Sequence, residues 1–443
     1  MSDSAVGSPG APDLTNESLR RRLAAVECPG VTTFSSHWPI FWVRGDGATV
    51  WDADGRDYID LTAAFGVAAL GHSHPAVTAA LSAQAATLLH GMGDVHPPLL
   101  KVLLLERLAA LAPGDLHLGM LGLNGADAVE TALRCAHLVT GKPGVIAFEG
   151  AYHGLLGRSL AVTARRDFRD PFGAPGRTTF VEFPHDSVSG ERALSELARK
   201  LRSKSSGLPP VGALIIEPIQ GRGGFVVPPD GFLREVAKLC RQAGVMVVVD
   251  EILTGFGRTG TLFAIDREGV VPDLLCLGKA LGGGMPISCC MGHEGSLGRW
   301  PAASGEALLT ATFQGHPGAA AAALATLDVI VGTDLAGRAE RLGQAGRATI
   351  EGAGLRVRGR GLMLAIEVGR GMTPDGIPAG VAVMEKALAA GVLVLCEGAD
   401  AEVIAITPPL TIDEALFDLA LSRVIDVVKR VLPGLAPEAN ARS

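Results

Sequence analysis

The chain has 443 residues, of which 48% are hydrophobic and 19% are charged, a composition typical of a globular protein with two or three domains. Its net charge of −7 and the lack of a sustained basic run argue against a nucleic-acid-binding surface. No stretch reaches the roughly 18 uninterrupted apolar residues that a membrane-spanning helix needs, so we expect no membrane partner.

The N-terminal region is expected to begin with a disordered leader over residues 1–17, which are polar and contain no apolar signal core. Residues 41–58 then show two alternating runs with Gly-Asp-Gly and Asp-Ala-Asp-Gly turns, a pattern typical of a β-meander. We therefore assign residues 18–75 to an N-terminal segment that contains this meander.

From about Pro75 the pattern changes to long helices, such as Asp127–Thr140 and Phe232–Ala243, that alternate with short apolar strands. Strands separated by crossovers predict a mainly parallel sheet covered on both faces, so we expect a large α/β domain over residues 76–325. The expected strands are Gly144–Phe148, Ser159–Thr163, Thr179–Phe183, Val211–Glu217, Val245–Asp250, Leu274–Leu277 and Ile287–Met291.

After an Ala-rich helix near 317–331 the pattern becomes α+β, which predicts a smaller C-terminal domain over residues 326–443. The chain should end in an amphipathic helix over Ile412–Leu432. The strand-like runs of this domain are Leu362–Val368, Val392–Leu395 and Val403–Thr407.

Two of the predicted strands lead into charged residues, Asp250 and Lys279. Both should emerge at the carboxyl edge of one sheet, where open α/β sheets bind ligands. A buried lysine that loses its proton is a nucleophile for carbonyls, and a buried carboxylate needs a cationic partner such as a pyridinium nitrogen. The pair predicts a pyridoxal phosphate site, with Lys279 forming the Schiff base and Asp250 holding the ring nitrogen protonated.

Two further segments could hold a phosphate. Residues 124–127 follow an apolar run and open a helix, whose free N–H groups and dipole suit an anion, although an ordinary helix cap has the same pattern. Residues 310–315 place hydroxyl groups ahead of another helix and form a second candidate.

Three side chains at predicted strand ends have two readings each. Tyr152 could stack on a flat cofactor or fill a half-buried core position. His153 could orient a neighbour or be structural, and Glu217 could act on the substrate or pair with a basic residue.

Gly255, Gly257 and Gly260 have the spacing of a dinucleotide-binding fingerprint. No helical pattern follows at once and no acidic residue stands about 20 positions further on, so we interpret this stretch as a glycine-rich active-site loop. The seven cysteines include no CxxC pair and lie mostly in apolar segments. We therefore expect no metal site and a reducing, cytoplasmic compartment.

In this order and spacing, the motifs resemble those of the class III aminotransferases, the fold-type I pyridoxal phosphate enzymes that include 4-aminobutyrate and ornithine aminotransferases. The resemblance runs from about Trp38 to Leu432. It implies a large domain with a mainly parallel sheet covered by helices, and a smaller α+β domain built from the N- and C-terminal segments. It also implies a homodimer with shared active sites.

By position, the resemblance implies that Lys279 and Asp250 are the catalytic pair, and that Ile252 and Tyr152 pack on the two faces of the cofactor ring. Thr312 would reach the phosphate of the neighbouring subunit. The implied cofactor-binding residues, of which the first two would hold the phosphate through their backbone, are Gly125, Ala126, Tyr152, His153, Glu217, Asp250, Ile252, Lys279 and Thr312.

Four positions depart from the family pattern. Ala405 stands where an arginine often binds an α-carboxylate, and Arg222 replaces the glutamate that commonly pairs with it. Leu155 and Leu253 replace an arginine and a glutamine found in some members. The first two changes look coupled, because a buried carboxylate without its cation costs several kcal/mol. Arg222 could anchor a substrate carboxylate from the opposite wall, or pair with Glu217 or another local acid.

The sequence thus predicts a pyridoxal phosphate aminotransferase that moves an amino group from an amine or ω-amino acid to a small 2-oxo acid. The ω-amino donor is favoured because the usual α-carboxylate anchor is missing at Ala405. An amino-acid epimerase, decarboxylase or lyase on the same scaffold remains open, since a fold does not fix the reaction. A nicotinamide-dependent oxidoreductase using the glycine-rich loop is a remote alternative.

Overall fold

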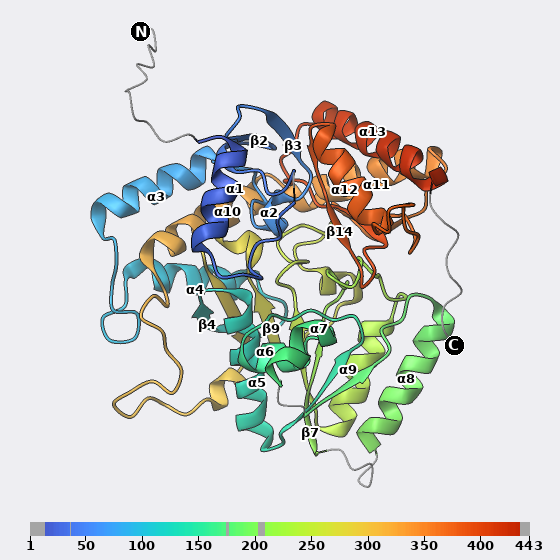
Figure 1. The fold of residues 1–443 in the computed structure, drawn as a ribbon. Coiled ribbons are helices and arrows are strands. Elements are labelled where there is room, and N and C mark those ends of the chain that lie inside the picture. The colour runs from blue at the N-terminus through green and yellow to red at the C-terminus, as the bar shows by residue number, and fades with distance from the viewer. Residues whose placement is uncertain (1–13, 36, 174–176, 203–208, 435–443) are drawn as a thin grey trace.

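The structure is a computed structural model that describes residues 14–35, 37–173, 177–202 and 209–434 (Figure 1). Most of the predicted leader lies outside the described residues. Residues 14–17 of the leader are described. They include Thr15, which caps helix α1 (Asn16–Val26), so the helix begins inside the predicted leader.

A seven-stranded sheet forms the centre of the molecule, in the order β4-β10-β9-β8-β7-β5-β6. All pairs from β9 to β6 are parallel, and only β10 runs antiparallel to its two neighbours. The predicted mainly parallel sheet is therefore confirmed. Its strands are β4 (Leu118–Gly122), β5 (Gly144–Phe148), β6 (Thr178–Val181), β7 (Val211–Ile216), β8 (Met246–Asp250), β9 (Leu274–Leu277) and β10 (Ser288–Gly292).

The central strands are continuous apolar runs because helices cover both faces of the sheet. Along β8, Met246 and Val248 belong to the core beneath α5 (Gly125–Thr140), whereas Val247 and Val249 pack in the core that contains α9 (Phe232–Ala243). This alternation follows from the two-residue period of a strand. The remaining helices of this part are α3 (Pro75–Thr87), α4 (Leu99–Leu111), α6 (Gly157–Val162), α7 (Arg166–Arg169), α8 (Ser187–Arg202) and α10 (Pro317–Gly332).

One predicted strand is wrong. Residues 159–163 belong mostly to α6, a short helix that starts at Gly157, where φ is +50°. The Ser159 hydroxyl accepts from the Leu156 N–H and donates to the Leu156 carbonyl, which supports a helical turn. A short apolar run does not distinguish a strand from a buried helical turn.

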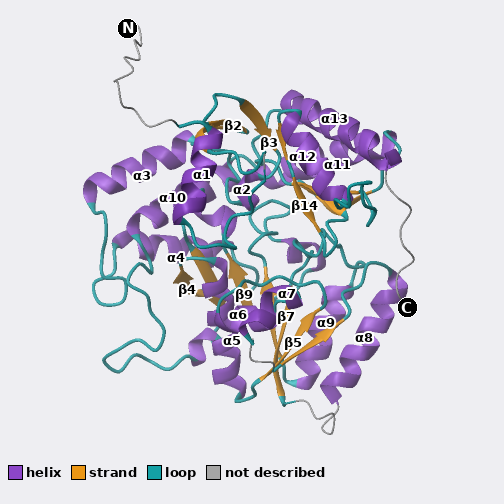
Figure 2. Cartoon of the chain, viewed as in Figure 1, coloured by secondary structure: helices purple, strands orange, loops and turns teal. Residues whose placement is uncertain are grey.

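The N- and C-terminal segments meet in one sheet. Two of its strands, β2 and β3, are labelled in Figure 2. The predicted meander is formed by β1 (Trp42–Asp46), β2 (Thr49–Asp52) and β3 (Asp57–Asp60), and β13 (Val392–Leu393) adds to β3 in parallel. A third sheet has the order β11-β12-β15-β14. The other elements of this part are the short helix α2 (Ala63–Gly66), β11 (Val357–Arg360), β12 (Met363–Glu367), β14 (Leu395–Glu397), β15 (Val403–Ile406), α11 (Leu335–Gly352), α12 (Ala379–Ala389) and α13 (Glu414–Val431).

Among the described residues, no single helix is long and apolar enough to cross a membrane. Within the same residues, the bent pair formed by α10 and α11 has the length and composition of a membrane span, and no other pair does.

Candidate active site

The predicted charge pair lies at one edge of the central sheet. Asp250 is the last residue of β8 and stands opposite Cys276 of β9, and Lys279 follows the end of β9. Both side chains border a cavity of about 320 Å³. The cavity is lined by Asn124, Gly125, Ala126, Tyr152, His153, Gly154, Leu155, Leu156, Glu217, Asp250, Ile252, Leu253, Thr254 and Lys279.

Lys279 is partly buried, and its backbone lies in the left-handed region at φ +39°. Such backbone strain in a residue with a side chain is concentrated at functional sites. Desolvation lowers the pKa of its amine, while the carboxylates of Asp250 and Glu217 act in the opposite direction. A lysine in these surroundings loses its proton more readily than a surface lysine.

Asp250 is fixed by two contacts. His153 Nδ1 lies 2.7 Å from Asp250 Oδ2, and the backbone N–H of Ile252 donates to Asp250 Oδ1 at 3.0 Å. Both Asp250 and His153 are buried, so His153 takes the orienting position that the sequence left open. The Nε2 atom of His153 is buried and has no partner within the described ranges.

The amino end of α5 forms another wall. The Asn124 side chain accepts from the Asp127 N–H at 3.1 Å, and Asp127 Oδ2 accepts from the Leu123 N–H at 2.8 Å. The first N–H groups of a helix have no acceptor within it, so those of Gly125 and Ala126 are available to an anion. Gly125 is required by close packing, since a Cβ there would come within 2.9 Å of an Ile252 methyl.

Glu217 connects two loops of the cavity wall. Its carboxylate accepts the backbone N–H of Tyr152 at 3.0 Å and that of Gly221 at 2.9 Å. Burial raises its pKa. These contacts favour a bracing role over a pairing with a basic residue.

Arg222 does not pair with Glu217. Its Nε lies 3.2 Å from Oε2 of Glu397, and its guanidinium stands over the Tyr152 ring at 5.7 Å from the centroid. Sequence reasoning missed Glu397, although it ends an apolar strand, as Asp250 does.

Besides Arg222, two predicted site residues lie outside the cavity lining. Thr312 is exposed in the loop ahead of α10. Ala405 is buried in β15, in an apolar cluster that includes Met363 and Val403 and against which Leu253 packs. An apolar surrounding of this kind explains why no cation is present at position 405.

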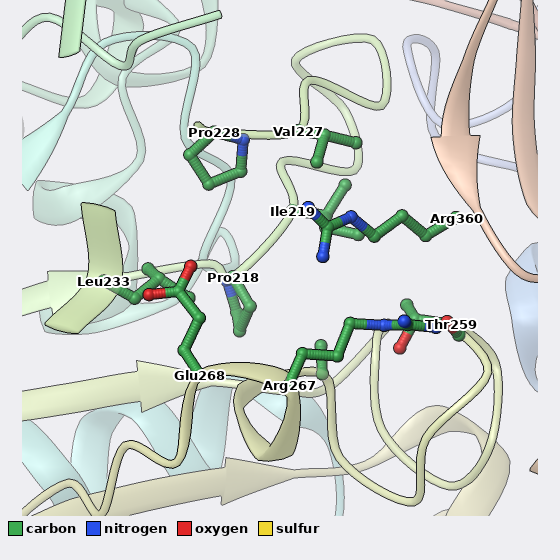
Figure 3. Close-up of a pocket in the computed structure, with 10 residues that line it drawn as sticks. Pro218, Ile219, Val227, Pro228, Leu233, Thr259, Arg267, Glu268 and Arg360 are labelled. Atoms are coloured by element: carbon green, nitrogen blue, oxygen red, sulfur yellow. Dashed lines mark hydrogen bonds between the residues drawn. The ribbon is translucent and has the colours of Figure 1, made fainter. Parts of the chain in front are cut away.

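Residues 255–260, which form the glycine-rich loop, do not line the cavity. Instead, Arg258 donates from Nη1 to the carbonyls of Leu362 and Pro408, which ties the loop to the C-terminal part of the chain. Figure 3 shows Arg267 and Arg360 lining a small hollow beside it, of about 10 Å³. This volume is sufficient for no more than about one water molecule.

The cavity fits pyridoxal phosphate. It offers free N–H groups at a helix terminus for a phosphate, a fixed carboxylate for a ring nitrogen, and a lysine for an aldehyde. His153 is also one of the lining residues, and its buried Nε2 has no hydrogen-bond partner among the described residues.

Comparisons with known proteins agree with this fit. The family model described as aminotransferase class-III matches residues 32–428. The chain is 36% identical to the 4-aminobutyrate aminotransferase of Mycobacterium tuberculosis, over 96% of this chain and 97% of that protein. It is 37% identical to the acetylornithine aminotransferase of Methanopyrus kandleri, over 75% of this chain and 82% of that protein.

Solved structures extend the likeness to the whole fold. An (S)-enantioselective omega-transaminase of Thermomicrobium roseum superposes with a TM-score of 0.86 at 28% identity, covering 94% of this chain and 99% of that one. An ornithine aminotransferase of Toxoplasma gondii, described with pyridoxal phosphate at its active site, gives a TM-score of 0.81 at 30% identity and covers 95% of each chain. The chain therefore belongs to the class III aminotransferases, and it transfers amino groups with pyridoxal phosphate as its cofactor.

Proposed function

We propose that Lys279 attaches the cofactor through its Nζ and that Asp250 binds the ring nitrogen. One observation carries the proposal: the two side chains emerge from neighbouring parallel strands into the cavity that also receives the amino end of α5. The amino end of α5, Asp250 and Lys279 could thus bind the phosphate, the ring nitrogen and the aldehyde of one cofactor molecule at the same time.

When bound, pyridoxal phosphate supplies an electron sink that makes the carbon–hydrogen bond next to the donor nitrogen acidic. Lys279 would hold the cofactor and would accept and return a proton at its Nζ during the transfer. Its amine suits this role, because burial lowers its pKa and so favours the form without the extra proton. Asp250, held by His153, would stabilise the protonated ring nitrogen.

Other residues would position the cofactor. The backbone N–H groups of Gly125 and Ala126, supported by the dipole of a 16-residue helix, would hold the phosphate. Ile252 and Tyr152, which both line the cavity, would pack on opposite faces of the ring. Thr312 would contribute to the site of a partner subunit.

The donor is proposed to be an amine or an ω-amino acid, and the acceptor a small 2-oxo acid. Relatives named for 4-aminobutyrate and acetylornithine support a donor whose reacting amine is not on the carbon next to a carboxylate. The buried, apolar position of Ala405 supports the same class, because it leaves no cation there.

We also propose a homodimer in the cytoplasm. The loop between α3 and α4 packs on the loop before α10, through a His90–Phe313 ring contact at 5.1 Å and a Thr310–Asp94 hydrogen bond (Figure 1). Together they expose an apolar surface suited to a second copy, formed by Leu88, Leu89, Met92, Val95, Leu308 and Phe313. All seven cysteines are free, which supports a reducing compartment.

The substitution Lys279→Ala tests the catalytic assignment. The variant should lose turnover by at least about a thousandfold, because no other group can replace the nucleophile. It should also lose the visible absorbance of the attached cofactor. Lys238→Ala, on the exposed face of α9, is the control and should keep both properties. A Lys279 variant that retains absorbance and turnover would contradict the assignment.

A further inference from the structure

Asn124 is followed directly by Gly125, and an asparagine before glycine is open to attack on its side chain, because glycine has no Cβ to obstruct the backbone nitrogen. The chain has only three asparagines, Asn16, Asn124 and Asn440, and this is its one Asn-Gly pair. The pair stands at the start of α5, and both residues line the cavity. A chemically labile dipeptide thus lies where the cofactor phosphate is proposed to bind.

The local geometry leaves the two reacting groups free to meet. Asn124 is exposed, and among the described residues its side chain has one hydrogen bond, which Oδ1 accepts from the Asp127 N–H at 3.1 Å. The N–H of Gly125 is the first of the helix and has no acceptor within it. Turning the peptide between Asn124 and Gly125 therefore disturbs mainly the contact of the Asn124 carbonyl with that same Asp127 N–H, at 3.1 Å.

The amino end of α5 also favours the reaction itself. Attack on the side-chain amide places negative charge on Asn124 Oδ1, which the Asp127 N–H and the helix dipole stabilise. A bulkier residue at position 125 would slow the attack, but a Cβ there would come within 2.9 Å of an Ile252 methyl. The packing that requires Gly125 therefore keeps the labile sequence in place.

We propose that Asn124 is a deamidation site that the bound cofactor protects. The Gly125 nitrogen bonds to Asn124 Cγ, the Cγ–Nδ2 bond breaks, and Nδ2 leaves as ammonia with the Gly125 amide proton. Water then opens the resulting succinimide at either of its two carbonyl carbons, which gives aspartate or isoaspartate without oxidation or reduction. A phosphate that accepts from the Gly125 N–H holds this nitrogen away from Cγ.

The reaction would make loss of the cofactor permanent. Either product has a carboxylate at position 124, close to that of Asp127, which accepts from the Asn124 N–H at 3.3 Å, and the added charge repels a phosphate. Isoaspartate also lengthens the backbone and so displaces the N–H groups of Gly125 and Ala126. The site thus links the lifetime of the enzyme to its supply of cofactor. The inference rests on the proposed function, because it requires the phosphate to lie at this helix terminus.

Peptide mapping by mass spectrometry, after incubation of the full-length apoenzyme and holoenzyme at mildly alkaline pH, detects the replacement of NH2 by OH at Asn124. The rate should follow the fraction of enzyme without cofactor, so pyridoxal phosphate at about ten times its Kd should slow it about tenfold. Pyridoxal, which has the aldehyde but no phosphate, should protect Asn124 much less. Asn16, whose buried amide donates to Asp52 and Asp54, is the internal control and should stay unmodified.

Two substitutions separate the reaction from its consequence. Asn124→Ser keeps a capping hydroxyl and has no amide to lose, so its incubated apoenzyme should regain all of its visible absorbance when pyridoxal phosphate is added. The wild type should regain only the share that has kept its asparagine. Asn124→Asp has one of the products from the start and should bind the cofactor about tenfold more weakly in equilibrium dialysis.

Three results would overturn the proposal. They are an Asn124 that stays intact in the apoenzyme while the urea-unfolded chain deamidates, equal rates with and without pyridoxal phosphate, and equal protection by pyridoxal. The visible absorbance of the attached cofactor reports on Lys279 separately, so its absence in the wild type would contradict the proposed function instead.

Discussion

At Asp250 and Glu251, two adjacent carboxylates occupy opposite environments. Asp250 faces the cavity and contacts His153 Nδ1. Glu251 is fully buried on the other side, where it accepts from the Thr254 hydroxyl and from the Ile265 N–H at 2.9 Å. Burial raises the pKa of Glu251 to about 7, since no cation lies among its contacts. The first carboxylate borders the cavity proposed to bind the cofactor, and the second holds the loop that follows β8.

The raised pKa of Glu251 predicts a pH-dependent stability. Folding favours its protonated form, so the free energy of unfolding should fall as pH rises from 4.5 to about 7. In Glu251→Gln the part of this loss that Glu251 contributes should be absent. The variant should match the wild type near pH 5 and exceed its stability by roughly 1–3 kcal/mol at pH 8.

Urea unfolding of the two proteins at both pH values measures this difference. Glu235→Gln, an exposed change on α9, is the matched control and should behave as the wild type does. An equal offset between Glu251→Gln and the wild type at pH 5 and pH 8 would show that the carboxyl does not titrate as described.

At the scale of elements, strands β5, β8 and β9 were predictable because each is a continuous apolar run between a helix and a polar turn. Their parallel order then brings Asp250 and Lys279 to one edge. Helix α6 was not predictable, because its few apolar residues have no period long enough to separate helix from strand. Its geometry depends on Ser159 and on a positive φ at Gly157.

The partner of Arg222 shows the limit of local patterns. The sequence indicates that a cation has replaced an acid at this position, but Glu397 reaches it only because β14 of the C-terminal sheet lies against the loop after β7. The docking of two elements far apart in the chain depends on tertiary packing, which no short motif encodes. The same reason applies to Thr312, whose expected role requires a second subunit.

For the whole molecule, the shared sheet of β3 and β13 fixes the N-terminal segment to the C-terminal part. The exposed apolar surface on the α3–α4 loop predicts that Leu89→Asp weakens self-association, because a charge would be buried at the contact. Sedimentation velocity at micromolar concentration should show dimers for the wild type and mainly monomers for the variant. Leu419→Asp, at an exposed position of α13, should leave the dimer intact. Unchanged sedimentation of Leu89→Asp would place the interface elsewhere.

The central claim is that the lysine after β9 attaches the cofactor in the cavity beside Asp250. Borohydride reduction of the holoenzyme makes such an attachment permanent, and peptide mapping by mass spectrometry then identifies the modified lysine. The account predicts that the added mass lies on the peptide containing Lys279 and is absent from the peptides of Lys101, Lys142 and Lys238. A reduced cofactor on any of these other lysines, with Lys279 unmodified, would contradict it.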